Sequence, residues 1–424
     1  MPASTTTEDR PKAAGRMWQI HWQEAVRQAR PEIARALEKP FSGEELDFDD
    51  GMRLSAAEGL DLVALARVAD ELRRQAAGDA ITYVVNRNLN FTNVCTVGCA
   101  FCGFSRGPHA TDAYFHSNDA LVEKAVDAAK LGATEVCIQG GLPRDLSAYY
   151  YRDLLRAIKA ALPDMHVHAF SPMELANGVE RTGLPLRDYL LLLKDAGLGS
   201  IPGTAAEILD DEVRSELSPN KLKVAQWVEI IRAAHELGIP TTSTMMYGHV
   251  ERPEHWVRHI LLLRDIQRQT RGFTEFVPLG FIHSKTRLYR IGGARAGSSF
   301  EEHLKVHALA RVLLHGHIRN IQVSWVKMGF DVALACLEAG ANDFGGTLME
   351  ESISKAAGAA FGESVSPAEF RSLIRSIGRT PAERTTTYRI RQTFECVDLD
   401  EKLPGVCASN VSATQPPRYA GTDY

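Results

Sequence analysis

The sequence lacks three features that would assign it to a class at once. It has no strong excess of charge, since 48 Lys and Arg stand against 53 Asp and Glu and the formal net charge is −5. It has no apolar run near the roughly 20 residues that span a bilayer. Its first residues, Met1 to Lys12, contain no apolar signal core. We therefore expect a cytoplasmic protein that binds neither nucleic acid nor membranes.

Cysteine is scarce and unevenly placed. The 424 residues contain seven cysteines, an odd number in a long chain, which argues against a disulfide scaffold. Three of them, Cys95, Cys99 and Cys102, lie within eight residues. The other four are scattered at Cys137, Cys336, Cys396 and Cys407. Because 45% of the residues are hydrophobic, the chain can fill a large core and a folded protein is expected.

Residues 81–390 alternate short strand-like runs with amphipathic helical patterns, which predicts parallel strands joined by right-handed crossovers. The helical patterns over 120–131, 186–196 and 221–237 are each followed at once by a glycine, a residue that ends helices. The predicted strands are 82–91, 134–138, 165–170, 198–202, 240–246, 273–278, 320–323 and 342–344. Eight strands predict an α/β fold with a (β/α) TIM-type barrel, complete or partial, and an open doubly wound sheet is the alternative.

The segments on either side of this barrel core differ from it in composition. Residues 18–80 place apolar side chains at helical spacing among charged ones, which predicts a helical N-terminal extension packed against the barrel. Residues 1–17 are rich in Thr, Ala and charge and are predicted to be a disordered tail. Residues 391–424 contain two adjacent prolines and several Ser and Thr, which predicts a loose C-terminal tail.

Polar or glycine-rich residues follow most of the predicted strands. In a (β/α) barrel the loops after the strands carry the chemistry, so these segments should surround a cavity. They are 90–93, 139–141, 171–174, 203–204, 247–249, 324–327 and 342–343.

The clustered cysteines have the spacing C-x3-C-x2-C and directly follow the first predicted strand, which places them at the catalytic end of the barrel. Thiolates are soft ligands that suit iron–sulfur clusters or zinc. A structural zinc site needs four ligands, usually in two separated pairs, and the distant cysteines form no second pair. A 4Fe-4S cluster held by three cysteines leaves one iron open for a substrate or cofactor. The alternatives are a zinc site that borrows His109 and plain buried cysteines.

This spacing, with the aromatic Phe101 beside the last cysteine, resembles the radical S-adenosylmethionine (SAM) superfamily. The resemblance implies that Cys95, Cys99 and Cys102 hold a 4Fe-4S cluster whose open iron chelates SAM. The reduced cluster then cleaves SAM into methionine and a 5′-deoxyadenosyl radical, while the protein binds, orients and excludes water.

Other cofactor-binding residues follow from the same resemblance. Gly140 and Gly141, after the second predicted strand, resemble the glycine motif near the SAM amino group, although a simple turn would look the same. Phe101 is expected beside the cofactor. Glu174 is expected to accept hydrogen bonds from SAM or a substrate amine, and the alternative is a carboxylate that stabilises a helix N-terminus.

A narrower resemblance extends over roughly residues 25–388. The run Val85-Asn-Arg-Asn-Leu-Asn-Phe-Thr-Asn-Val-Cys95 is similar to the entry to the cluster in the deazaflavin and futalosine group of these enzymes. Six further segments resemble the 4-hydroxybenzyl (4-hydroxyphenyl) transferases of deazariboflavin (FO) synthesis. They are 166–174, 201–214, 241–249, 273–278, 324–329 and 340–350. Thr96 stands where an aromatic residue is expected, and Gly103 where alanine is usual.

The resemblance implies transfer of the 4-hydroxybenzyl group of L-tyrosine to C5 of 5-amino-6-(D-ribitylamino)uracil, with 2-iminoacetate as the other product. One C-x3-C-x2-C motif implies the transferase half alone, with a separate cyclising radical SAM subunit as partner. An electron donor such as ferredoxin or flavodoxin is also expected. The alternatives are a menaquinone enzyme of the futalosine pathway and a non-enzymatic iron–sulfur or zinc protein.

Two residues are candidates for catalysis and six for substrate binding. Tyr247 and His249 end the fifth strand and are predicted to move a proton during tyrosine activation, with structural hydrogen bonding as the alternative. His166 and His168 share one face of a strand and are predicted to line the cavity, although hydrogen-bonded core histidines are common. The remaining four candidates for substrate contact are Ser324, Trp325, Asn342 and Asp343, with packing or a turn as the alternative role.

Overall fold

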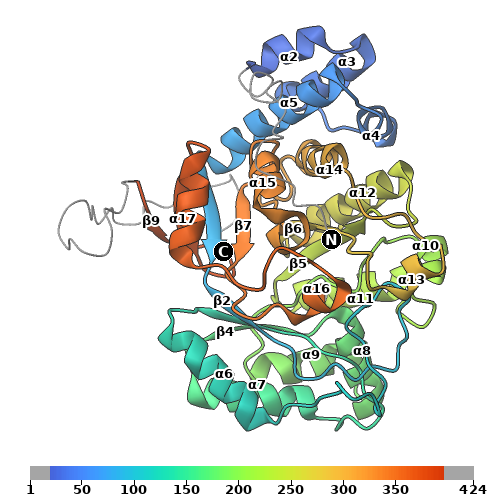
Figure 1. The fold of residues 1–424 in the computed structure, drawn as a ribbon, viewed down its shortest axis with the longest axis vertical. Helices are drawn as coiled ribbons and strands as arrows, with labels where there is room; N and C mark the ends of the chain where they lie inside the picture. The colour runs from blue at the N-terminus through green and yellow to red at the C-terminus, as the bar shows by residue number, and fades with distance from the viewer. Residues whose placement is uncertain (1–19, 396–424) are drawn as a thin grey trace, which may run out of the picture.

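The computed structural model describes residues 20–395, and the predicted N-terminal tail and most of the predicted C-terminal tail lie outside this range. Parallel strands surrounded by helices form its centre (Figure 1). The strands of this centre are β1 (Ala80–Val84), β2 (Asn86–Leu89), β3 (Glu135–Ile138), β4 (His166–Ala169), β5 (Thr241–Tyr247), β6 (Phe273–Gly280) and β7 (Asp343–Gly346). β1 and β2 are two halves of the predicted first strand, separated by Val85.

Parallel pairing follows the order of the chain. β2 pairs with β3, β3 with β4, β5 with β6, and β1 with β7. The predicted strands at 198–202 and 320–323 contribute only isolated parallel bridges, which link β4 to β5 and β6 to β7. Because β1 and β2 are consecutive, these pairs lead around a barrel and back to the first strand. The predicted α/β barrel fold is therefore confirmed.

Helices connect the strands and cover the outside of the barrel (Figure 1). Ser117 caps the first of them by accepting a hydrogen bond from the Ala120 N–H, and the chain turns after it at Gly132, where φ is +89°. The helices are α6 (Asn118–Lys130), α7 (Tyr150–Ala161), α8 (Pro172–Thr182), α9 (Leu186–Asp195), α10 (Asp211–Leu217), α11 (Val224–Glu236), α12 (Pro253–Thr270), α13 (Arg287–Arg290), α14 (Phe300–Leu313), α15 (Trp325–Leu337), α16 (Ser352–Ala357) and α17 (Pro367–Ser376).

Within the described residues, four helices precede the barrel and pack on its outer layer. They are α2 (Trp22–Gln28), α3 (Pro31–Ser42), α4 (Phe48–Ser55) and α5 (Leu60–Ala77). α5 lies against α14, and α4 lies against α12 (Figure 1). The contact between α4 and α12 is close, because a Cβ on Gly51 would lie 2.6 Å from Val257 Cγ1. Among the helices of residues 20–395, none combines the length and hydrophobicity that crossing a bilayer requires.

A C-terminal hairpin, which the sequence did not predict, closes one end of the barrel. β8 (Thr380–Arg384) pairs in parallel with β1, and β9 (Ile390–Thr393) pairs antiparallel with β8. The loose tail predicted from residue 391 therefore begins with a strand, because β8 offers β9 an edge for pairing. Since β8 aligns with residues 80–83, at the start of the first strand, the hairpin lies at the amino-terminal end of the barrel.

Candidate active site

A single cavity of about 430 Å³ runs through the barrel, from the cysteine loop to the C-terminal hairpin. Its walls are alternate residues of the strands, because successive side chains of a strand point to opposite faces. On β5, for example, Thr242, Thr244 and Met246 line the cavity. We call the end near the cysteines the mouth. We call the opposite end the floor, which is formed by Asn86, Glu135, His168, Glu275, Arg384 and Thr386.

The three clustered cysteines lie together at the mouth. All three line the cavity and are partly buried. Backbone hydrogen bonds hold their loop, from the Cys95 N–H to the Arg106 carbonyl (3.0 Å) and from the Ala100 N–H to the Leu217 carbonyl (2.9 Å). Burial raises the pKa of the Cys99 thiol to about 12. A thiolate at this position therefore needs a metal to stabilise it.

The donor set at the mouth suits an iron–sulfur cluster better than a single metal ion. Within residues 20–395, no three His, Cys, Asp or Glu side chains converge on one ion. The thiolates of a 4Fe-4S cluster bind different irons, so they need not converge. His109, the fourth ligand of the zinc interpretation, is exposed and does not line the cavity. Cys137 lines the cavity below the loop and Cys336 is buried in the core, while Cys396 and Cys407 lie outside the described residues.

Gly140 and Gly141 lie where the end of β3 touches the cysteine loop. A Cβ on Gly141 would stand 2.2 Å from the Val94 carbonyl oxygen, and one on Gly140 would stand 2.5 Å from the Phe91 ring. Only glycine permits this approach. The Gly141 N–H donates to the Thr92 carbonyl at 2.8 Å. The two glycines of the predicted motif therefore allow the cysteine loop to pack directly against the end of β3.

Glu174 lines the cavity, but its carboxylate is occupied within the protein. It accepts hydrogen bonds from the Ser171 N–H (2.7 Å), the Ser171 hydroxyl (2.6 Å) and the Gly140 N–H (3.0 Å). With Ser171 it forms a capping box at the start of α8. Burial raises the pKa of Glu174 to about 7. The structure thus gives Glu174 the helix-terminal role that was the alternative to ligand binding.

Two lysines lie at the mouth. Lys221, which was not among the predicted site residues, has its Nζ 5.1 Å from the centre of the Phe101 ring and 2.7 Å from Glu207 Oε1. Lys327, which belongs to the predicted cavity segment 324–327, lines the cavity from the first turn of α15, and burial lowers its pKa. None of the described carboxylates forms an ion pair with its ammonium. No spacing rule identifies Lys221, because its position depends on which side chains the fold brings beside the cysteine loop.

The two predicted histidines of β4 lie on either side of one hydroxyl group. His166 Nε2 and His168 Nδ1 each lie 2.7 Å from Ser200 Oγ. His168 also lines the cavity, whereas His166 does not. Burial lowers the pKa of His168 to about 4, so this imidazole is neutral near pH 7. His166 thus has the alternative role, hydrogen bonding within the core. His168 makes such a hydrogen bond and also lines the cavity.

Ser324 and Trp325 reach the cavity from the start of α15, as predicted for substrate contact. The Trp325 indole N–H donates to the Gly346 carbonyl at 3.1 Å, and its ring stacks on Phe330. These contacts fix the orientation of the indole beside the mouth.

Tyr247 and His249, the predicted catalytic pair, point away from the cavity. Met246 occupies the inward position on β5, so Tyr247 faces outward and its hydroxyl lies 2.6 Å from His303 Nδ1. His249 is 1% exposed and lies 3.1 Å from Glu251 and 2.9 Å from the Met246 carbonyl. Both side chains therefore support the outer layer, and the proton-transfer role predicted for them is not supported.

Asn342 and Asp343 also belong to the framework and do not line the cavity. Asn342 Oδ1 accepts from Arg311 (2.8 Å) and from the Ile321 N–H (2.9 Å). Asp343 accepts two hydrogen bonds from Arg384, at 2.5 and 2.9 Å. Every side-chain oxygen of the two residues already has a partner in the protein, so the structure gives no support to the substrate contacts predicted for them.

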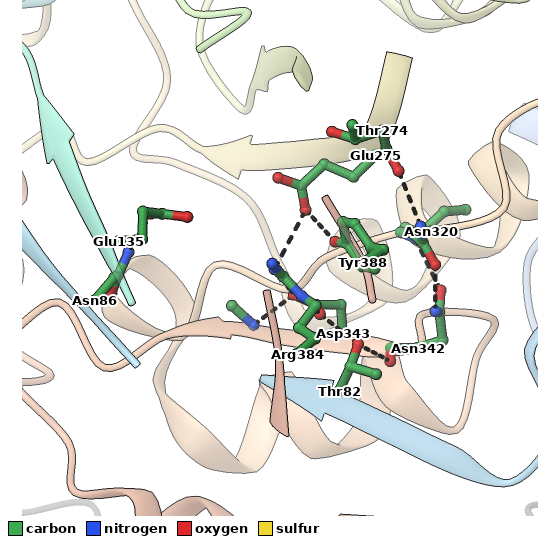
Figure 2. Close-up of polar contacts among 12 residues, drawn as sticks. Thr82, Asn86, Glu135, Thr274, Glu275, Asn320, Asn342, Asp343, Arg384 and Tyr388 are labelled. Carbon is green, nitrogen blue, oxygen red and sulfur yellow. Dashed lines mark hydrogen bonds and ion pairs between the residues drawn. The ribbon is translucent and has the colours of Figure 1, made fainter. Parts of the chain in front are cut away.

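The floor is the part of the site that the sequence did not reveal. Figure 2 shows Glu275 of β6 between Arg384 and Tyr388, with the Tyr388 hydroxyl donating to the Glu275 carboxylate. The guanidinium of Arg384 stacks 4.0 Å from the centre of the Tyr388 ring. Glu135 of β3 accepts from the Asn86 side chain at 2.8 Å. These residues come from distant parts of the chain, so no local motif marks them. The available signal was a single polar residue at a cavity-facing position of a strand that is otherwise apolar.

The parallel barrel with a cysteine loop at its mouth defines the architecture of radical SAM proteins. Two family models match the chain: the radical SAM superfamily over residues 89–263, and the CofH/MqnC C-terminal region over residues 270–397. Among solved structures, the FeFe-hydrogenase maturase HydG from Carboxydothermus hydrogenoformans is similar in fold. Its TM-score is 0.67 at 17% identity, over 89% of this chain and 85% of that one.

Curated relatives narrow the family. The chain is 51% identical to the 5-amino-6-(D-ribitylamino)uracil–L-tyrosine 4-hydroxyphenyl transferase of Methanocaldococcus jannaschii, over 77% of this chain and 92% of the relative. It is 50% identical to the enzyme of the same name from Methanothermobacter thermautotrophicus, over 84% and 96%. The FO synthase of Mycobacterium leprae is 53% identical, but the match spans 81% of this chain and only 40% of that protein. The chain belongs to the family of these 4-hydroxyphenyl transferases.

Proposed function

We propose that the protein transfers the 4-hydroxybenzyl group of L-tyrosine to C5 of 5-amino-6-(D-ribitylamino)uracil. The Cα–Cβ bond of tyrosine breaks and the benzyl carbon forms the new bond to C5. The tyrosine remainder leaves as 2-iminoacetate, after one hydrogen atom has passed from tyrosine to 5′-deoxyadenosine. The electron that reduces SAM is returned when the coupled product loses one electron and one proton.

The observation that carries this proposal is that one cavity joins the cysteine loop to a polar floor inside the barrel. A radical formed at the mouth could therefore meet two further reactants inside the barrel. Family membership supplies the identity of those reactants, because the full-length relatives carry tyrosine and the ribitylaminouracil in their names.

Cys95, Cys99 and Cys102 would hold a 4Fe-4S cluster and leave one iron open for SAM. When bound, this group supplies the electron that cleaves the sulfonium of SAM. Phe101, Gly140 and Gly141 lie beside the three cysteines and would shape the SAM site.

The FO synthases that the chain matches are more than twice as long as the match, since it spans 40% of their length. The chain carries one C-x3-C-x2-C motif. We infer that it supplies the tyrosine-transfer half-reaction, with a separate radical SAM subunit to close the deazaflavin ring. A ferredoxin or flavodoxin would reduce the cluster.

The decisive experiment is a coupled-product assay. The cluster is reconstituted without oxygen, reduced, and mixed with SAM, L-tyrosine and the diaminouracil, and the products are analysed by mass spectrometry. We expect the coupled product, 5′-deoxyadenosine and 2-iminoacetate, each dependent on tyrosine. A reaction that consumes SAM but leaves tyrosine intact would instead favour the futalosine relative, the second candidate among the CofH/MqnC proteins.

A further inference from the structure

The floor contains polar groups that no protein partner satisfies. Thr386 is 6% exposed and lines the cavity, yet its hydroxyl makes no hydrogen bond within the described residues. It faces the Glu135 carboxylate and helps to lower the pKa of that group, so Glu135 is its one neighbour, among the described residues, able to accept from it. Glu275 is 7% exposed and also lines the cavity, and its side-chain contacts with Tyr388 and Arg384 both involve the oxygen Oε2. A buried hydroxyl without a partner is costly unless a ligand or water completes it.

The charges at the floor discriminate among the three reactants. Three carboxylic side chains, Glu135, Glu275 and Asp343, lie at or beside the floor. The guanidinium of Arg384 is already bound by Asp343 through two hydrogen bonds, and Glu275 lies 3.8 Å from it. SAM and L-tyrosine each carry a carboxylate, and a further carboxylate here would be repelled. The ribitylaminouracil carries no carboxylate but has amino groups, ring N–H groups and hydroxyls. Its donors match the acceptors of the floor.

The mouth offers the opposite chemistry. Lys327 lines the cavity, and no carboxylate within residues 20–395 forms an ion pair with it, while Lys221 lies beside the cysteine loop. Carboxylates of the amino-acid reactants can therefore be neutralised at the mouth, where the radical chemistry starts.

We propose that the floor is the binding site for the ribityl chain of the acceptor, with Thr386, Glu135 and Glu275 as its hydrogen-bonding partners. The uracil ring then lies between the floor and the mouth, with C5 facing the mouth. This inference rests on the proposed function and goes beyond it, because it makes the C-terminal segment 384–388 the part that selects the acceptor.

Thr386→Val tests the inference with little risk to the fold, since valine has nearly the same shape and, among the described residues, the hydroxyl has at most the Glu135 carboxylate as a partner. Binding of the diaminouracil to the cluster-loaded enzyme is measured by calorimetry, and KM values are measured for each reactant. We expect the Kd and KM of the acceptor to rise roughly three- to tenfold, the cost of one hydrogen bond. The KM of L-tyrosine should stay within about twofold.

Thr387→Val is the matched control, because Thr387 is the neighbouring residue and is exposed. It should leave both KM values unchanged. A second substrate, 5,6-diaminouracil without the ribityl chain, sharpens the test. Wild-type enzyme should prefer the ribityl acceptor, and Thr386→Val should reduce that preference by the same three- to tenfold, since only the ribityl chain reaches the floor.

The possible failures are distinguishable. If wild-type enzyme makes no coupled product, the proposed function is wrong and the inference falls with it. If wild-type enzyme makes the product but Thr386→Val raises the KM of tyrosine instead, tyrosine occupies the floor and the inference alone is overturned. An unchanged acceptor Kd in Thr386→Val would also overturn it.

Discussion

The mouth and the floor of the cavity are held together by different kinds of interaction. The mouth is a short loop that carries three cysteines, held mainly by backbone hydrogen bonds and by two glycines that allow close packing. The floor is a network of buried side chains from β1, β2, β3, β6, β7 and the C-terminal hairpin, and Arg384 lies at its centre (Figure 2). The difference indicates that the residues for the chemistry lie at the mouth, while the network that stabilises the fold lies at the floor of the same cavity. Changes at the mouth should therefore affect the chemistry first, whereas changes at the floor should affect stability or acceptor binding.

The largest effect is expected from Cys99→Ala. Loss of this thiolate should abolish SAM cleavage, because the proposed cluster would lose one of its three protein ligands. The folded structure should remain, since the loop is at the mouth and outside the main hydrophobic core. Iron content, 5′-deoxyadenosine formation and circular dichroism measure the three consequences.

Cys137→Ala is the control for this experiment, because Cys137 lines the same cavity outside the motif. It should keep its iron and cleave SAM. Turnover in Cys99→Ala at the wild-type rate would refute the ligand assignment and remove the contrast between the two ends.

The second effect concerns the floor. Arg384→Met leaves the buried Asp343 carboxylate without its bidentate partner. Breaking a buried ion pair in this way should lower the free energy of unfolding by about 3–5 kcal/mol. Urea denaturation of the protein measures the change.

Arg391→Met, on the adjoining strand β9, removes an exposed pair with Glu383 and should cost at most about 1 kcal/mol. Equal stability losses in the two arginine variants would mean that the floor is not a stabilising network.

The smallest effect is expected where the cysteine loop packs against the end of β3. Gly141→Ala places a methyl group 2.2 Å from the Val94 carbonyl oxygen, so the cysteine loop must shift. Such overpacking should cost about 1–3 kcal/mol of stability and lower cluster occupancy, measured by iron content and thermal melting.

Gly107→Ala is the matched control, because a Cβ there meets no atom within 4 Å. If Gly141→Ala retained full iron and the wild-type melting temperature, the close approach of loop and strand would have no part in holding the cluster loop.

Much of the barrel could be predicted because its signals are local. The three helices expected to stop before Gly132, Gly197 and Gly238 do end there. Six of the eight predicted strand positions form strands in the structure, and they are short apolar runs whose neighbours are turn residues. The other two, 198–202 and 320–323, form bridges only. The hairpin of β8 and β9 was missed because it lies beyond the last βα repeat, where no periodic pattern continued.

The prediction of site residues succeeded or failed according to the register of each strand. Ser324 and Trp325 follow a strand end that opens into the cavity. Tyr247 stands at a strand end that is just as polar. Its side chain points outward, because side chains alternate between the two faces of a strand and Met246 takes the inward position.

The amino-acid sequence alone determined the spacing of the cysteines, the order of strands and helices, and the glycines at their ends, because each of these depends on neighbouring residues. Only the tertiary structure decided which polar residues share the cavity. Asp343 and Glu275 are 68 residues apart and meet Arg384 from a third segment. Whether a buried carboxylate binds a substrate or a guanidinium of the same chain depends on packing across such distances, and no local pattern encodes it.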